Sequence, residues 1–188
     1  MPDSGITDGT TFTSSFWDTY ARQQVVTQCT SGARPTGVEG RLISETDTDR
    51  IMWYTGAAWD YVAEPPQTWS VTSVTQSGAK ACTTTYGWYQ RCRGSFVAQI
   101  TLTGFAAGVA GNAITIPTPV TLANAEAVGG SFSYLDSGVG YYAGFVQPFT
   151  TTAISFLQDG SNNAFGAVTS LALAAADVLR VTMTGRYA

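Results

Sequence analysis

The sequence predicts a mainly β protein, with a short N-terminal helix, a small β-meander and a C-terminal β-sandwich of the jelly-roll type. Short runs rich in Val, Thr, Phe and Tyr recur along the chain, and Gly, Pro, Asn or Asp separate them. Charged residues make up only 12% of the 188 positions, whereas 44% are hydrophobic and 12% aromatic. This composition opposes disorder. It also predicts that other protein chains cover much of the surface, because a free monomer usually needs more charge for solubility.

The best helix candidate spans residues 14–29. Ser15 to Asp18 has the form of a capping box, with Asp where Glu or Gln is more common. Trp17 and Val25 follow helical spacing, and Gly32 provides a stop signal. The resulting apolar face is narrow and partly polar, so we expect this helix to pack against copies of itself or against a protein that hosts it.

Residues 35–64 predict a β-meander with strands at 41–45, 51–54 and 59–62. About thirty residues of meander cannot bury their own aromatic side chains, so these must find a neighbour. With the helix, the meander forms an expected attachment region, 1–64, followed by a Pro-rich linker at 65–67. The expected attachment and oligomer interface comprises Phe16, Trp17, Tyr20, Trp53, Tyr54, Trp59 and Tyr61.

The remainder, 68–188, predicts the β-sandwich. Turn signals at short intervals separate strand-like runs, as in sandwiches and jelly rolls. These runs are 69–75, 95–102, 112–116, 130–135, 140–146, 151–157 and 178–187. In the last run, Leu179, Val181 and Met183 alternate with polar residues, which predicts one buried face.

Charge, targeting signals and cysteines restrict the protein's setting. A net charge of −4 opposes nucleic-acid binding, which needs a broad basic field. We expect neither export nor membrane insertion, because the start lacks a signal-peptide pattern and no apolar run is long enough to span a bilayer. Cys82 and Cys92 flank Gly87 symmetrically, so they either pair across a hairpin or remain reduced, while Cys29 has no evident partner.

Three stretches resemble structural proteins of tailed bacteriophages. Arg34 to Val62 is similar to a module with a Pro-containing opening, a Glu-Gly turn, a strand, an Asp-Thr-Asp turn, an aromatic strand and Gly-x-x-Trp. Phe16 to Val26 is similar to helices that open such proteins in phages of actinobacteria. Tyr86 to Gly94 and Leu173 to Val181 resemble the beginning and end of the sandwich in phage fibres and minor tail proteins.

The resemblance implies a homotrimer of jelly rolls that is located in the virion and contacts other phage structural proteins. Two hypotheses follow. In the first, the protein is a tail-associated fibre or receptor-binding subunit, docked by residues 1–64. In the second, it is a capsid decoration protein or head fibre with the same docking. A depolymerase of envelope polysaccharide is a distant third.

The residue types oppose catalysis, and we expect no cofactor and no metal. The chain contains no His, which removes Ser-His-Asp triads, Cys-His pairs and most zinc sites. Glu45, Asp47 and Asp49 have some likeness to a calcium loop, but they lack its Gly and its closing Glu, so a solvated turn is the better interpretation. Asp177 fits a structural role, either paired with Arg180 or bound to backbone amides at the start of a strand.

Aromatic residues are the remaining candidates for function. Exposed Tyr and Trp rings stack on sugars or anchor protein interfaces, but rings in such positions more often pack in a trimer core or between sheets. The candidates for contact with a host glycan or host protein are Tyr86, Trp88, Tyr89, Tyr141 and Tyr142.

Overall fold

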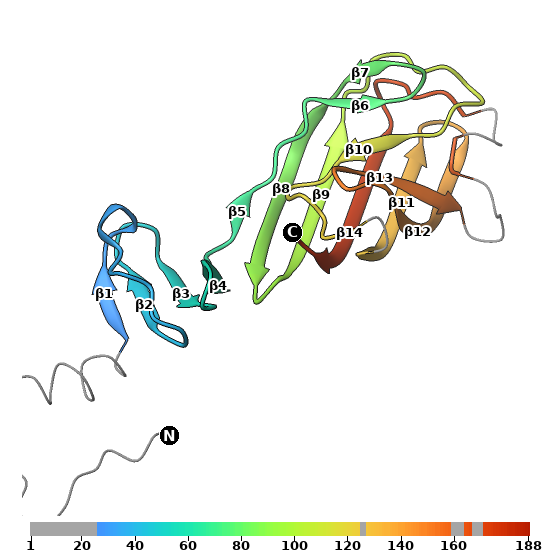
Figure 1. Ribbon diagram of the computed structural model, residues 1–188. Helices are drawn as coiled ribbons and strands as arrows, with labels where there is room; N and C mark the ends of the chain where they lie inside the picture. Colours follow the sequence, from blue (N-terminus) through green and yellow to red (C-terminus); the bar gives the residue numbers. More distant parts are fainter. Residues whose placement is uncertain (1–25, 125–126, 159–163, 167–170) are drawn as a thin grey trace, which may run out of the picture. The chain divides into compact units, whose positions relative to one another are not determined.

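The computed structural model describes residues 26–124, 127–158, 164–166 and 171–188, and in these ranges the protein is almost entirely β (Figure 1). It divides into two compact units: unit 1 ends at Pro65 and unit 2 begins at Pro66. Within the described ranges the helical structure is the three-residue 3₁₀ turn η3, Ser31–Ala33. The predicted mainly β class is therefore confirmed.

Unit 1 is a four-stranded sheet in the order β1-β2-β3-β4. Its strands are β1 Thr27–Cys29, β2 Leu42–Glu45, β3 Arg50–Tyr54 and β4 Trp59–Ala63. The last three are antiparallel neighbours and coincide with the three strands predicted from the sequence. β1 lies parallel to β2 and makes the sheet mixed.

The helix predicted over 14–29 is wrong at its C-terminal end, because Thr27–Cys29 form β1. Residues 14–25 of that prediction lie outside the described ranges. Val26 and Thr27 are β-branched and fit an extended backbone well. The hydrogen bonds offered by β2 outweigh a weak helical pattern, and they extend to Thr46, whose amide donates to the carbonyl of Cys29 at 2.9 Å.

Unit 2 is a ten-stranded antiparallel sheet, curled into a half-barrel, with the order β5-β8-β9-β14-β11-β12-β13-β10-β6-β7. Its strands are β5 Gln67–Thr68, β6 Ser73–Thr75, β7 Ala79–Ala81, β8 Thr83–Cys92, β9 Ser95–Thr103, β10 Thr115–Pro117, β11 Val128–Asp136, β12 Gly140–Thr150, β13 Ala153–Gln158 and β14 Val178–Arg186. In Figure 1, β10 and β13 pass in front of β9, β14 and β11. Apolar side chains from β10 and β13 and from β9, β14 and β11 form a core inside the curled sheet.

The two ends of this strand order belong to one long hairpin. At one end β5 pairs with β8, and at the other β6 pairs with β7, although β5 and β6 follow each other along the chain, as do β7 and β8. Thr84 holds the segment between β5 and β6. Its hydroxyl accepts a hydrogen bond from the Val71 amide at 2.8 Å and donates one to the Val71 carbonyl at 2.9 Å. Thr75 then pairs with Thr115 of β10. The hairpin thereby links both sides of the curled sheet.

β8 is the longest strand that the sequence did not predict, because Gly87 resembles a hairpin-turn residue. This residue lies inside β8, directly opposite Ile100, and not in a hairpin turn. A Cβ at this position would lie 2.1 Å from the carbonyl oxygen of Trp69, so glycine is needed for close approach of two backbone segments. Cys82 and Cys92 consequently lie at opposite ends of a strand, about 33 Å apart at the usual rise per residue. Of the two alternatives for these residues, pairing across a hairpin is excluded, and none of the three cysteines is in a disulfide.

Other strand predictions agree with the structure to different extents. Runs 95–102, 130–135, 140–146, 151–157 and 178–187 fall largely within β9, β11, β12, β13 and β14. The run 112–116 moves to Thr115–Pro117, and only 73–75 of the run 69–75 is strand. The linker expected at 65–67 already contains the first residue of β5. The predicted alternation in β14 is confirmed, since Leu179, Val181 and Met183 are at most 1% exposed.

Candidate binding surfaces

One face of the unit 1 sheet holds its small core. Ile43 and Met52 lie directly opposite each other and are 0% and 2% exposed. Tyr61 lies opposite Met52 on the same face, and the guanidinium of Arg50 is 5.5 Å from its ring centroid. The rings of Tyr54 and Trp59 meet edge to face with centroids 5.3 Å apart.

The opposite face of this sheet carries three exposed apolar side chains, next to Ser44 and Asp60. Leu42 lies directly opposite Trp53, and Ile51 lies two residues before Trp53 on the same face. Their exposed fractions are 37% for Leu42, 40% for Ile51 and 37% for Trp53. We call these three residues the Trp53 face. Leu42 and Ile51 were not among the predicted interface residues, although the alternation along β2 and β3 placed them beside Trp53.

The described part of unit 1 buries little apolar surface. Within its described part, Ile43 and Met52 are the buried hydrophobic side chains. Burial of further apolar side chains against a partner would add stability to this sheet. The Trp53 face is where such packing is available.

The predicted attachment aromatics therefore separate into two groups. Trp53 lies on the exposed face, whereas Tyr54, Trp59 and Tyr61 lie on the half-buried face around Met52. The other three predicted residues, Phe16, Trp17 and Tyr20, lie outside the described ranges.

The acidic residues of the unit 1 turn have structural partners. Glu45 is 1% exposed and accepts hydrogen bonds from Arg34 and, at 2.6 Å, from the Thr48 hydroxyl. Burial alone would raise the pKa of Glu45, but these hydrogen bonds and the charge of Arg34 outweigh it and hold the pKa below its usual value. Asp47 accepts from the amide and the hydroxyl of Ser31 at 2.8 and 2.6 Å. Both carboxylates thus fasten the turn.

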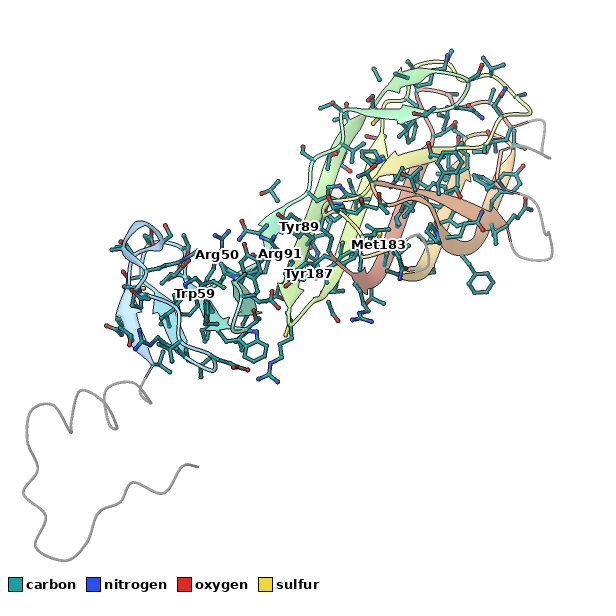
Figure 2. All side chains as sticks on the ribbon, viewed as in Figure 1. Arg50, Trp59, Tyr89, Arg91, Met183 and Tyr187 are labelled. Carbon is teal, nitrogen blue, oxygen red and sulfur yellow. The ribbon has the colours of Figure 1, made fainter. Side chains whose placement is uncertain are left out.

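Only part of the predicted host-contact set in unit 2 faces solvent. Tyr86 of β8 is 55% exposed and Tyr141 of β12 is 76% exposed. Trp88 shares the outward face of β8 with Tyr86 and is half-buried. Tyr89 faces inward, where the guanidinium of Arg91 lies 5.8 Å from its ring centroid and 5.9 Å from that of Tyr187 (Figure 2).

Tyr142 belongs to the core and not to the surface. Its ring lies 5.5 Å from Phe165 and 6.4 Å from Tyr134, which is 0% exposed. The prediction of Tyr89 and Tyr142 as host-contact residues is therefore at odds with their inward positions. Strand alternation explains both cases, because each immediately follows an outward-facing aromatic residue.

Segment 139–149 exposes large apolar side chains that the prediction overlooked. Val139, Phe145 and Phe149 are 73%, 61% and 60% exposed, beside Tyr141 at 76%. The sequence indicated this exposure of apolar side chains, because positions 141, 143, 145, 146 and 149 are all apolar. Neither face of β12 is therefore polar along its whole length. A strand that is apolar on both faces is either buried on both or exposes rings. We call Val139, Tyr141, Phe145 and Phe149 the β12 patch.

A second, smaller exposed apolar area lies on β8 and β9. It consists of Tyr86, Trp88 and Val97, the last of which is 40% exposed, and we call it the β8–β9 patch. One row of directly paired residues crosses the sheet from this patch to the β12 patch. The row runs Trp88, Gln99, Thr182, Ser131 and Phe145. Two strands, β14 and β11, therefore lie between the two patches, and polar side chains separate them.

The most buried carboxylate of unit 2 organises a loop. Asp177 is 1% exposed and accepts hydrogen bonds from the Tyr134 hydroxyl, from the Ser137 amide at 3.0 Å and from the Ala174 amide at 2.6 Å. Burial, and then the hydrogen bond to Asp177, raises the pKa of Tyr134 above its usual range. Of the two roles expected for Asp177, the structure supports binding to backbone amides at the start of β14.

Nucleophilic or metal-binding groups do not gather in the described residues. Burial raises the pKa of the Cys82 thiol, and burial followed by the charge of Glu45 raises that of Cys29, which disfavours the reactive thiolate. In the same ranges no cluster of three His, Cys, Asp or Glu side chains has the geometry to hold a metal ion. An open groove of about 420 Å³ near the β8–β9 turn is lined by Ser95, Thr184 and Arg186, among others, and by no carboxylate of a described residue.

Comparison of the chain with protein-family models, with curated proteins and with solved structures finds no match. Nor does the described part of the chain contain a helix that is long and apolar enough to cross a membrane.

Proposed function

We propose that the protein is a non-enzymatic structural subunit of a bacteriophage particle. It is a trimeric, tail-associated fibre or receptor-binding appendage, docked by residues 1–64, with unit 2 as its jelly-roll-like projecting part. The observation that carries the proposal is the Trp53 face, three exposed apolar side chains on a sheet that, in its described part, buries two hydrophobic side chains. A module of this kind gains its stability by packing onto another protein, as an attachment region does.

The sequence resemblance supports the same assignment. The stretch that resembles the phage module, Arg34 to Val62, contains the whole Trp53 face. The acidic turn within this stretch is held by Arg34 and Ser31, so its carboxylates act in the architecture of the module. The second reading, a capsid decoration protein or head fibre, uses the same attachment region and differs in the location on the particle.

Attachment is tested with full-length variants. Trp53→Asp places a charge on the Trp53 face, and we expect particles assembled with this variant to lose the protein. Val38→Asp is the matched control, because Val38 lies in the same unit, is 45% exposed and is outside this face. Quantitative immunoblotting of purified virions gives the incorporated amount. Normal incorporation of Trp53→Asp would contradict docking through this face, and gold-labelled antibody on wild-type particles would distinguish tail from head.

The non-enzymatic part of the proposal needs its own test. Unit 2 has four acidic residues in all, and the two that the structure describes, Asp136 and Asp177, lie together at the end of the sheet where loops are anchored. We expect no release of reducing ends when purified protein is incubated with host envelope polysaccharide. Turnover that is abolished by Asp136→Asn would refute the proposal and establish the depolymerase alternative.

A further inference from the structure

The proposed trimer requires two different contact surfaces on each subunit. A cyclic trimer is closed by a heterologous interface, in which one patch of a subunit meets a different patch of the next subunit. A single self-complementary patch produces a two-fold dimer instead. A surface that builds the trimer must therefore occur as a pair of patches on one chain.

The outward face of the unit 2 sheet carries such a pair, the β12 patch and the β8–β9 patch. Together they contain most of the large hydrophobic side chains that unit 2 exposes within its described residues, with Val109 as the one outside them. Two strands, β14 and β11, separate the patches on the curled sheet, so the patches lie on different parts of its outer face. This is the arrangement that a closed ring of subunits needs.

Charged side chains also distinguish the strands that carry the two patches from the strand between them. The outward positions of β8, β9, β11 and β12 carry no charged side chain, whereas β14, which lies between the two patches, carries Arg180 and Arg186 on its outward face. Interface centres are depleted of charged residues and rich in Tyr, Trp and Phe. The strands on either side of β14 have the composition of an interface, and β14 has that of a surface in contact with water.

The exposed rings of the β12 patch supply about half of the area that an interface needs. A whole aromatic side chain accounts for about 150–250 Å². At exposed fractions of 76%, 61% and 60%, Tyr141, Phe145 and Phe149 together present on the order of 400 Å² of ring surface. This is about half of the roughly 800 Å² that each partner contributes to a standard interface. Val139 and the small outward residues of β11 enlarge the surface further.

We propose that the β12 patch of one copy packs against the β8–β9 patch of the next, so that three copies of unit 2 close into a ring. This inference rests on the proposed trimeric state and assigns the surfaces that build it. It also gives the exposed Tyr86 and Tyr141 a role in self-association, in place of the contact with a host glycan that was one of the two alternatives for them.

The first test is the mass of full-length variants in solution, measured by size-exclusion chromatography with light scattering. Wild type is expected at three times the chain mass of 19.8 kDa. Phe145→Asp and Tyr86→Asp, each a change at an exposed side chain, are expected to weaken assembly at least tenfold and to yield monomers at micromolar concentration. Val109→Asp is the control, because Val109 is 46% exposed and lies outside both patches. Circular dichroism checks that each variant is folded.

The second test combines the two variants. An equimolar mixture still offers one intact pair of patches, the β8–β9 patch of the Phe145→Asp chain and the β12 patch of the Tyr86→Asp chain. Heterologous packing therefore predicts that the mixture forms a one-to-one dimer and no trimer, which native mass spectrometry resolves. A mixture that stays monomeric while both single variants are monomeric would overturn the pairing of these two patches.

The outcomes separate this inference from the proposed function. A monomeric wild type would overturn the trimer and the inference together. A trimeric wild type whose two patch variants also remain trimeric would overturn the inference alone. If those trimeric variants no longer bound host cells, the patches would be host-contact surfaces instead.

Discussion

Removal of the Asp177 carboxylate is the perturbation whose effect on unit 2 can be worked out most directly. The side chain is 1% exposed and accepts from one hydroxyl and two backbone amides. Asp177→Ala leaves three donors without this partner in a buried site. Each hydrogen bond to a charged group contributes about 1.5–3 kcal/mol, but the loop amides regain water when the loop relaxes. We therefore expect a loss of about 3–5 kcal/mol, which corresponds to a fall of about 10–20 °C in Tm for a unit of this size.

The assay is urea and thermal unfolding of the full-length protein, followed by near-ultraviolet circular dichroism. Tyr134→Phe keeps the ring and removes one donor, so its loss is expected at about 1–2 kcal/mol. The double variant is expected to show coupling of at least 0.5 kcal/mol, since the two groups are in contact. Thr182→Ala, at an exposed position of the neighbouring strand, is the control and is expected within about 0.5 kcal/mol of wild type. A change below about 1 kcal/mol for Asp177→Ala would refute the reasoning.

Three further predictions concern unit 2. Gln76 is 0% exposed and accepts a hydrogen bond from the Leu173 amide at 3.1 Å. Gln76→Leu should therefore lower the free energy of unfolding, measured in urea, by about 2–4 kcal/mol. An unchanged free energy would contradict the role of Gln76 as a loop anchor. Gly87→Ala should lower the unfolding midpoint, because the new methyl group meets the carbonyl of Trp69; an unchanged midpoint would show that the two segments separate freely. Burial, and then the neighbouring Asp177 carboxylate, raise the pKa of Asp136 in the folded state. Protonated Asp136 therefore stabilises the folded state fully below the unfolded-state pKa of about 4, and this contribution is lost as the pH rises through the folded-state pKa. Asp136→Asn should then be more stable than wild type at pH 7, with the difference shrinking towards pH 4 in paired urea titrations, and a gap independent of pH would count against this origin.

The local pattern of the sequence was sufficient for several elements. Alternation in Ser95–Thr103 and in Val178–Arg186 identified two central strands, because a half-buried strand must place apolar residues at every second position. The meander strands were found in the same way, with turns at Thr46 to Asp49 and at Thr55 to Ala57. Trp53, which the sequence marked as an interface candidate, and Tyr86 and Tyr141, which it marked as contact candidates, are exposed.

Other elements depended on contacts between residues far apart in the chain. Gly87 resembles a turn residue locally, yet it lies within a strand because the Trp69 backbone approaches it. Thr27–Cys29 had a helical spacing, yet they pair with a strand sixteen residues later. Gln76 gave no signal at all, since its value depends on the carbonyl of Leu171 and the amide of Leu173, nearly a hundred positions away.

The sequence by itself determined the mainly β class, the positions of the regular strands and the scarcity of charge, because these follow from composition and from periodicity within a single segment. Only the tertiary structure decided which rings are buried. Tyr141 and Tyr142 are adjacent and chemically identical, but one is 76% exposed and the other packs against Phe165. The register of β12 against β11 fixes which of the two faces the core, and register is set by pairing with distant strands. The two patches on the outer face exist for the same reason, since the curl of the sheet, and not any local motif, determines which side chains remain on its outside.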